Sequence, residues 1–171
     1  MSIKAAVFSD THGNIEYALA AVRGYKPDLI IHLGDHAWDA DDIHLEFPDI
    51  PMFRVRGNCD FATSAGDFEV VPLGPVNAFI THGHLYSVRY TTDSLVYAAQ
   101  EQGCSIAMYG HTHIPDNSEL GGVKILNPGT AGCGSYLTWA AVEVNDLGGI
   151  MTEIRGFSIY SSANLESSKG P

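Results

Sequence analysis

Short apolar runs bounded by polar clusters recur along the chain, and each has the length of one buried strand. They occupy residues 3–9, 29–33, 51–57, 76–80 and 105–109. Between the first two runs, apolar residues repeat at helical spacing from Ile15 to Val22. Asn14 is the expected N-cap of this helix, and Gly24 is expected to close it. The first half of the chain therefore predicts β-α-β units.

The second half of the chain changes its pattern. A helix is predicted over 92–102 with Gly103 as its stop, whereas the acidic segment 36–50 predicts a short helix or an irregular loop. Residues 123–126, 136–144 and 150–159 predict a β-meander with a hairpin turn at 146–149. Together the two halves predict an α/β fold, a two-sheet β-sandwich flanked by helices. One domain is expected over 1–158, followed by a polar, Ser-rich and mobile tail over 159–171.

Composition narrows the class of protein. Twenty acidic and nine basic residues give a formal charge of −11, which disfavours long nucleic acid and anionic membranes as partners. No apolar run reaches 18 residues, and the N-terminus lacks the pattern of a signal peptide, so we expect a cytoplasmic protein. The three cysteines have no CxxC spacing and are expected to be reduced thiols.

Five apolar runs each end in a polar cluster, and eight histidines are present in the chain. Because ligands bind at the carboxyl ends of strands in α/β folds, we expect these clusters to meet at one edge. In an extended segment, residues two apart project to the same side, as expected within the first and last clusters. The clusters are Asp10/His12, Asp35, Asn58, His82/His84 and His111/His113.

Imidazole, carboxylate and amide ligands favour divalent ions such as Mn²⁺, Fe²⁺, Ni²⁺ or Zn²⁺. Seven candidate ligands, the cluster residues without His84, exceed the needs of one tetrahedral site, but they suit two ions if Asp35 bridges them. Two such ions about 3.5–4 Å apart form a clamp for in-line phosphoryl displacement. They also supply the positive charge that this acidic chain otherwise lacks for binding a phosphate.

The order of the motifs DTHGN, GD, GNCD, THGH and GHTH resembles that of the calcineurin-like metallophosphoesterases. NPGT at 127–130 is similar to the NPGS of their short, single-domain prokaryotic phosphodiesterase branch. The resemblance covers roughly residues 3–158 and implies the four-layer fold of that family. It also implies a metal-bridging hydroxide as nucleophile and backbone N–H groups of Gly13 and Asn14 that assist with phosphate. The implied ligands are Asp10, His12 and His113 for one ion, Asn58, His82 and His111 for the other, and Asp35 as the bridge.

One departure concerns the proton donor to the leaving group. Many larger members of the superfamily have His after the Gly-Asn pair, where this chain has Cys59. A thiol is a poorer proton donor at neutral pH than an imidazolium. The donor is therefore His84, a metal-bound water or no group at all. Without a donor, esters with good leaving groups are favoured.

Other polar and aromatic residues have competing interpretations. His32 is expected to be a core histidine. His36 follows the proposed bridging Asp35, and its side chain is expected either close to the site or pointing away from it. Arg54 and Arg56 either contact phosphate or occupy a solvated strand face. Three more residues remain open: Asp60 is expected to orient a ligand or fix its loop, and Trp38 and Tyr86 line the cleft or pack as ordinary surface residues.

The preferred hypothesis is a phosphoesterase with two divalent ions, Mn²⁺ being favoured, that acts on small phosphodiesters or phosphomonoesters. Asp35, Asn58, His84 and Cys59 are the expected catalytic residues. The alternative is a scaffold protein that keeps the fold with a weak or inactive site, as in the retromer subunit of this superfamily. All seven ligand positions are filled here, which favours the enzyme. A homodimer or a larger homo-oligomer is compatible with either hypothesis.

Overall fold

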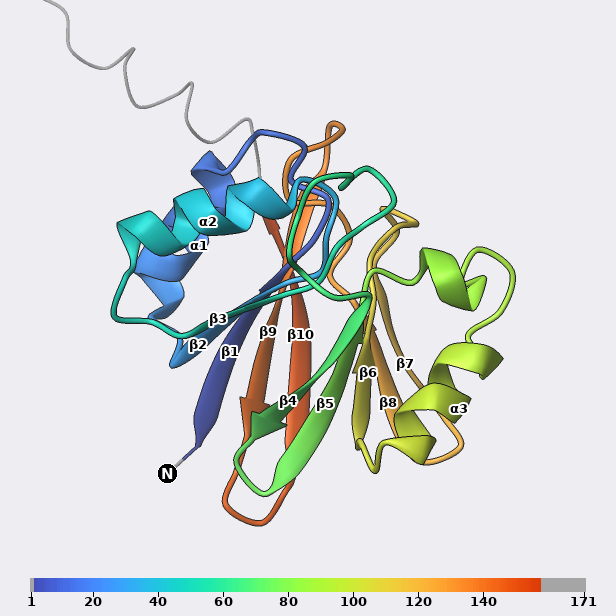
Figure 1. The fold of residues 1–171 in the computed structure, drawn as a ribbon. Helices are drawn as coiled ribbons and strands as arrows, with labels where there is room; N and C mark the ends of the chain where they lie inside the picture. Colours follow the sequence, from blue (N-terminus) through green and yellow to red (C-terminus); the bar gives the residue numbers. More distant parts are fainter. Residues whose placement is uncertain (1, 158–171) are drawn as a thin grey trace, which may run out of the picture.

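The computed structural model describes residues 2–157, which form two five-stranded sheets packed face to face (Figure 1). The first sheet has the order β10 (Ile150–Phe157), β9 (Leu137–Val144), β1 (Ile3–Phe8), β2 (Leu29–His32) and β3 (Met52–Arg54). The second has the order β4 (Phe68–Leu73), β5 (Val76–Thr81), β6 (Ile106–Met108), β8 (Val123–Asn127) and β7 (Asp116–Leu120).

Helices cover the outer face of each sheet and complete four layers. The helices α1 (Glu16–Tyr25) and α2 (Ala37–Glu46) lie on the first sheet, and α3 (Asp93–Glu101) lies on the second (Figure 1). A short 3₁₀ helix, η1 (His84–Tyr86), follows β5. The predicted two-sheet α/β sandwich flanked by helices is confirmed.

Alternating side chains of the central strands fill the spaces between layers. In β1, Val7 faces the core between the sheets, whereas Phe8 faces α1. In β5, Ile80 faces the same inner core and Phe79 faces α3. These side chains are essentially inaccessible to solvent, and each contributes about 1.5–3 kcal/mol through burial. The continuous apolar runs are therefore strands that are covered on both faces.

Several predicted boundaries were wrong. Ile15, not Asn14, is the N-cap of α1, and it makes no side-chain capping hydrogen bond. Gly24 lies inside the last turn of α1, and Lys26 takes the left-handed conformation that ends the helix. The expected strand 51–57 is only three residues long, and its arginines form exposed ion pairs, Arg54 with Asp41 and Arg56 with Asp67.

The expected C-terminal meander was also wrong, because its strands are divided between the sheets. β8 pairs with β7 in the second sheet, while β9 and β10 form a hairpin in the first. The hairpin turn at 146–149 is confirmed, with Asn145 N–H donating to Gly149 O at 3.0 Å. The predicted mobile tail, 159–171, lies outside the described residues. Among residues 2–157, no helix is long and apolar enough to cross a membrane.

Candidate metal centre

The polar clusters follow five of the strands that have a parallel neighbour, and the loops at the carboxyl ends of these strands meet at one edge (Figure 1). β1, β2 and β3 belong to the first sheet, and β5 and β6 to the second. Backbone hydrogen bonds join the loops: Asp10 N–H donates to Gly34 O, and Gly110 N–H donates to His82 O, both at 3.0 Å. The five polar clusters are thus brought together as the sequence predicted.

The backbone at the clusters is left-handed, which differs from the extended segments expected for Asp10/His12 and His111/His113. Among described non-glycine residues, eight have positive φ, and six of them belong to these loops or adjoin them. Such conformations cost free energy and persist where the surrounding structure enforces them, often at functional sites. The strand ends bring the clusters to one edge, and these turns, not an extended backbone, orient the side chains within each cluster. The six residues are Asp10, His12, Asp35, His36, His111 and His113.

The first group of candidate ligands is Asp10, His12 and His113. Asp10 Oδ1 is buried 3.0 Å from His113 Nε2 and 3.9 Å from His12 Nε2, yet it has no hydrogen bond. The two imidazole Nε2 atoms are 3.4 Å apart. A buried carboxylate oxygen without a partner is costly unless a cation neutralises it. The three ligand atoms lie within 4.8 Å of one another, which suits a single ion.

The second group is built around His82. His82 Nδ1–H donates to the Leu33 carbonyl at 2.7 Å, which leaves the Nε2 lone pair pointing at the site. That nitrogen lies 3.2 Å from Asn58 Oδ1 and 3.5 Å from Asp35 Oδ1. Three acceptors therefore face one another and need a proton or a cation between them. The His111 ring lies 5.2 Å from the His82 ring, so its nitrogen borders the same space.

Asp35 lies between the two groups, as expected of a bridge. Its Oδ2 is 4.0 Å from His12 Nε2, and its Oδ1 accepts a hydrogen bond from Cys59 N–H at 2.9 Å. Burial acts to raise the pKa of Asp35, but this hydrogen bond and the nearby His82 outweigh burial and lower it. The carboxylate is thus held ionised and available to cations on either side. Asp10, Asp35 and His82 also form a compact group.

The two candidate proton donors have different surroundings. His84 Nδ1 is buried without a hydrogen-bond partner, and its ring lies 5.4 Å from that of His82. Desolvation first, then His82, lowers the pKa of His84. Cys59 is exposed, and partial desolvation together with Asp35 raises its pKa to about 11. The thiol therefore stays protonated at neutral pH and is a weak acid.

The expected phosphate contacts of Gly13 and Asn14 were wrong, because both backbone N–H groups are already used. Gly13 N–H donates to Asp39 Oδ2 at 2.8 Å, and Asn14 N–H donates to Thr11 O at 2.9 Å. Neither donor is free for a ligand. The Asp39 side chain instead ties α2 to the loop that carries His12.

Supporting residues mostly follow the expectations. His32 is fully buried: it accepts a hydrogen bond from Gly34 N–H and contacts Thr11 Oγ1 at 2.9 Å. His36 does lie near the site, with its ring 5.3 Å from the His12 ring. Asp60 fixes its loop by accepting hydrogen bonds from the N–H groups of Ala37 and Gly57.

The contact of Arg89 with the site and the hydrogen bonds made by the NPGT segment were not predicted from the sequence. Arg89 Nε–H donates to His111 Nε2 at 2.9 Å, although no strand-end pattern marks this arginine. Asn127 donates to Gly110 O at 3.0 Å, and Thr130 Oγ–H donates to Asp10 O at 2.9 Å. The segment therefore holds together the loops of the Asp10/His12 and His111/His113 clusters. The sequence signal for these hydrogen bonds was the motif NPGT itself, whose Asn, Gly and Thr are typical of structured turns.

Comparisons with known proteins agree with this geometry. A family model described as the calcineurin-like phosphoesterase superfamily domain matches residues 3–146. The probable metallophosphoesterase YsnB of Bacillus subtilis is 33% identical over 126 residues, covering 72% of each chain. The phosphodiesterase MJ0936 of Methanocaldococcus jannaschii is 28% identical over 153 residues, covering 80% of this chain and 87% of that protein.

Solved structures show the same fold. A predicted phosphoesterase of Streptococcus pneumoniae superposes with a TM-score of 0.73 and 27% identity, covering 91% of this chain and 99% of that one. Vps29 of Entamoeba histolytica, complexed with Zn²⁺, gives 0.69 at 20% identity, covering 91% of this chain and all of that one. The domain match, the curated relatives and the arrangement of the clusters lead to one assignment: the chain belongs to the calcineurin-like phosphoesterase superfamily.

Proposed function

We propose that this chain is a two-metal phosphoesterase that hydrolyses small phosphodiesters or phosphomonoesters. The observation that carries the proposal is the set of facing acceptors His82 Nε2, Asn58 Oδ1 and Asp35 Oδ1, which calls for positive charge. Asp10, His12 and His113 would hold one ion, Asn58, His82 and His111 the other, with Asp35 shared. Mn²⁺ is the favoured ion, with Fe²⁺, Ni²⁺ and Zn²⁺ as alternatives.

The chain itself supplies orientation. Leu33 O fixes the ring of His82, and Cys59 N–H holds the carboxylate of Asp35. The Oδ2 atom of Asp10 accepts hydrogen bonds from Ser9 Oγ and His111 N–H, which points its Oδ1 into the site. Bound divalent ions at such a site lower the pKa of water and neutralise phosphoryl oxygens. Preorganised ligands reduce the reorganisation that this chemistry would otherwise require.

The surroundings of Cys59 affect which leaving groups the enzyme is expected to accept. Its pKa of about 11 makes the thiol a weak proton donor to a departing alkoxide. Esters that leave as stable anions, such as nitrophenolate, need no such donor. We therefore propose fast turnover of aryl esters and slow turnover of alkyl esters.

The test is hydrolysis of bis(4-nitrophenyl) phosphate by Mn²⁺-loaded protein. Asp35→Ala should abolish turnover, because it removes the carboxylate shared by both groups. Asp41→Ala is the matched control, since Asp41 is an exposed carboxylate paired with Arg54, and it should retain the parent rate. Folded, metal-loaded protein that hydrolyses neither monoesters nor diesters would show the proposal to be wrong.

A scaffold with an inactive site is the alternative. The likeness to Vps29 has 20% identity and shows the fold alone. Elemental analysis after dialysis separates the two functions, since a degraded site would retain fewer than two ions per chain. All seven expected ligand positions carry side chains that can bind a metal ion. The loss of such a side chain would favour the scaffold, and none of the seven positions has lost it.

A further inference from the structure

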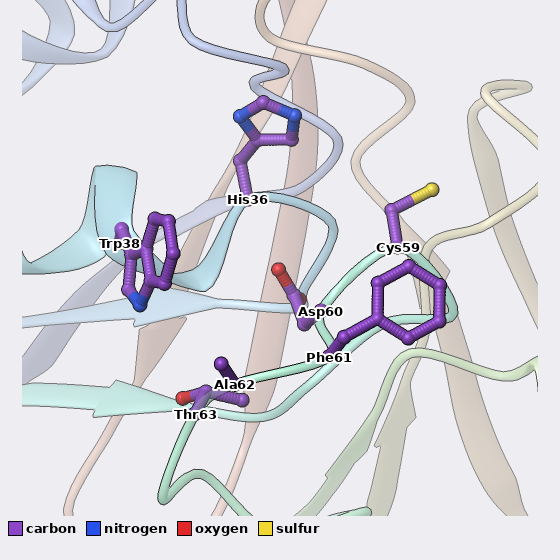
Figure 2. A pocket seen from close by; sticks show the side chains of 7 residues that line it. All are labelled: His36, Trp38, Cys59, Asp60, Phe61, Ala62 and Thr63. Atoms are coloured by element: carbon purple, nitrogen blue, oxygen red, sulfur yellow. The ribbon is translucent and has the colours of Figure 1, made fainter.

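A pocket of about 280 Å³ opens beside the candidate metal centre (Figure 2). Its volume is close to the ~300 Å³ at which pockets begin to bind small molecules. The pocket is formed by the start of α2 and by the loop after β3, two segments that also carry candidate ligands. Its lining residues are His36, Trp38, Cys59, Asp60, Phe61, Ala62 and Thr63.

Two aromatic side chains form opposite walls of this pocket. Figure 2 shows Trp38 on one side and Phe61 on the other, with Asp60 and Ala62 between them. Trp38 is 66% exposed and Phe61 is 94% exposed, so neither contributes much burial to the fold. Exposed aromatic surface that gathers at one concave place is typical of a binding site.

The pocket adjoins the metal centre directly. Cys59 in its wall follows the candidate ligand Asn58, and its N–H holds the bridging carboxylate of Asp35 at 2.9 Å. His36 in its wall follows Asp35, and its ring lies 5.3 Å from the ring of His12. A group esterified to a phosphate at the centre therefore has this pocket as a neighbour.

The polar groups of the pocket do little to attract a charged occupant. Both carboxylate oxygens of Asp60 already accept backbone hydrogen bonds at 2.8 Å, from Ala37 N–H and Gly57 N–H. Thr63 Oγ1 accepts a hydrogen bond from Ala65 N–H. The other lining residues are His36, Cys59, Ala62 and the two aromatic residues Trp38 and Phe61. A flat apolar ring is the chemistry that aromatic side chains lining a pocket recognise.

We propose that Trp38 and Phe61 bind the aromatic ring of the substrate, so that the enzyme selects phosphate esters carrying an aryl group or a nucleobase. This inference rests on the proposed function, because the phosphate of the same substrate occupies the metal centre. Trp38 and Phe61 are specificity residues in this scheme and touch no reacting atom.

The experiment measures binding by calorimetry to Mn²⁺-loaded protein with hydrolysis-resistant ligands. Phenylphosphonate is compared with methylphosphonate, and the phosphonate analogue of adenosine 5′-phosphate is compared with that of ribose 5-phosphate. The first pair tests for recognition of an aryl ring bonded to phosphorus, and the second tests for recognition of a nucleobase that a sugar separates from phosphorus. In at least one pair the ring-bearing ligand should bind about tenfold more tightly, equivalent to about 1.4 kcal/mol.

Variants then assign the preference to the pocket. Trp38→Ala and Phe61→Ala should bring the affinity ratio in that pair close to one and leave the affinity of the ring-free ligand unchanged. Tyr97→Ala is the matched control, because Tyr97 is 63% exposed on α3, away from this pocket, and it should keep the tenfold ratio.

The outcomes separate the inference from the proposed function. Equal affinities within both pairs, with clear binding of all four ligands, would overturn the inference and leave the phosphoesterase standing. A preference that survives Trp38→Ala and Phe61→Ala would also overturn it. Absence of binding for every phosphonate, despite bound Mn²⁺, would count against the phosphoesterase as well.

Discussion

Arg89 donates its Nε–H to Nε2 of His111, one of the proposed metal ligands, at 2.9 Å. Because a lone pair serves one partner at a time, a metal ion bound through this nitrogen would displace the guanidinium. Arg89 is exposed and forms no ion pair with a carboxylate in residues 2–157. The displaced side chain therefore remains beside the centre as a cation.

Removal of Arg89 should strengthen metal binding. Arg89→Ala eliminates the competing hydrogen bond, which at an exposed position contributes roughly 1 kcal/mol. We expect Mn²⁺ affinity of the substrate-free protein, measured by calorimetry, to rise up to about fivefold. Arg23→Ala is the control, because Arg23 pairs with Glu46 away from the site. Weaker Mn²⁺ binding by Arg89→Ala would mean that the arginine supports the ligand set.

Metal ions should stabilise the fold, because they neutralise the orphan oxygen of Asp10. Mn²⁺ at 100 times its dissociation constant should add about 2.7 kcal/mol to the free energy of unfolding. The melting temperature should rise with Mn²⁺ and fall again with a chelator. Asp10→Asn should lose most of this shift, whereas exposed Asp49→Asn should keep it. A melting temperature that does not respond to any divalent ion would contradict the ligand assignment.

Gly110 allows the loop after β6 to lie against Asp10. A Cβ at this position would collide with Ser9 Oγ and lie 2.8 Å from Asp10 Oδ2. Gly110→Ala should lower the free energy of unfolding by about 1–3 kcal/mol, as overpacking does. It should also weaken Mn²⁺ binding, because Asp10 and His111 are pushed apart.

Gly24→Ala is the matched control for that substitution. Gly24 lies inside α1, and an added Cβ meets nothing within 4 Å. Alanine there should raise the free energy of unfolding by about 0.5–1 kcal/mol, since it lowers the entropy of the unfolded chain. Denaturant titration measures both variants. Equal stability of Gly110→Ala and the parent would show that the loops tolerate a wider approach.

His32 should make the metal-free protein sensitive to acid. Burial first of all lowers its pKa to about 4, against about 6.5 in the unfolded chain. The unfolded state thus binds more protons between these values, so stability is full above pH 6.5 and is lost as pH falls toward 4. This group alone should remove about 2 kcal/mol between pH 7 and pH 5.

The measurement is chemical denaturation at several pH values in the presence of a chelator. His32→Asn keeps an acceptor for the Gly34 N–H, but it cannot gain the proton. Its stability should fall less steeply with acid than that of the parent. Parallel curves for the two proteins would show that His32 is not the group that titrates on unfolding.

The sequence by itself determined the central strands and the polar clusters that follow them. Ile30 and Ile31 belong to a run too apolar for anything but a strand covered on both faces, and Asp35 follows its end. Because parallel strands present their carboxyl ends at one edge, the convergence of Asp10, Asp35 and His82 was predictable. These features rest on local pattern and on a general rule of sheet topology.

The tertiary structure alone decided the edge strands β4 and β7. β4 is interrupted by Pro72 although it buries Val71 and Leu73, and β7 is almost wholly exposed. Both are held by pairing with β5 and β8, which are neighbours supplied by the fold. An edge strand needs only one pairing partner, so it tolerates a proline or a largely exposed sequence that does not by itself predict a strand.

The tertiary structure also decided the detailed contacts of the site. The left-handed turn at His12 has no sequence pattern of its own. The hydrogen bond from Arg89 to His111 and the shared pocket of Trp38 and Phe61 each bring together residues that are distant in the chain. No periodicity encodes them, because each depends on where the loops at the strand ends come to lie. The sequence gives the kinds of ligand, and packing decides their orientation and which groups compete for them.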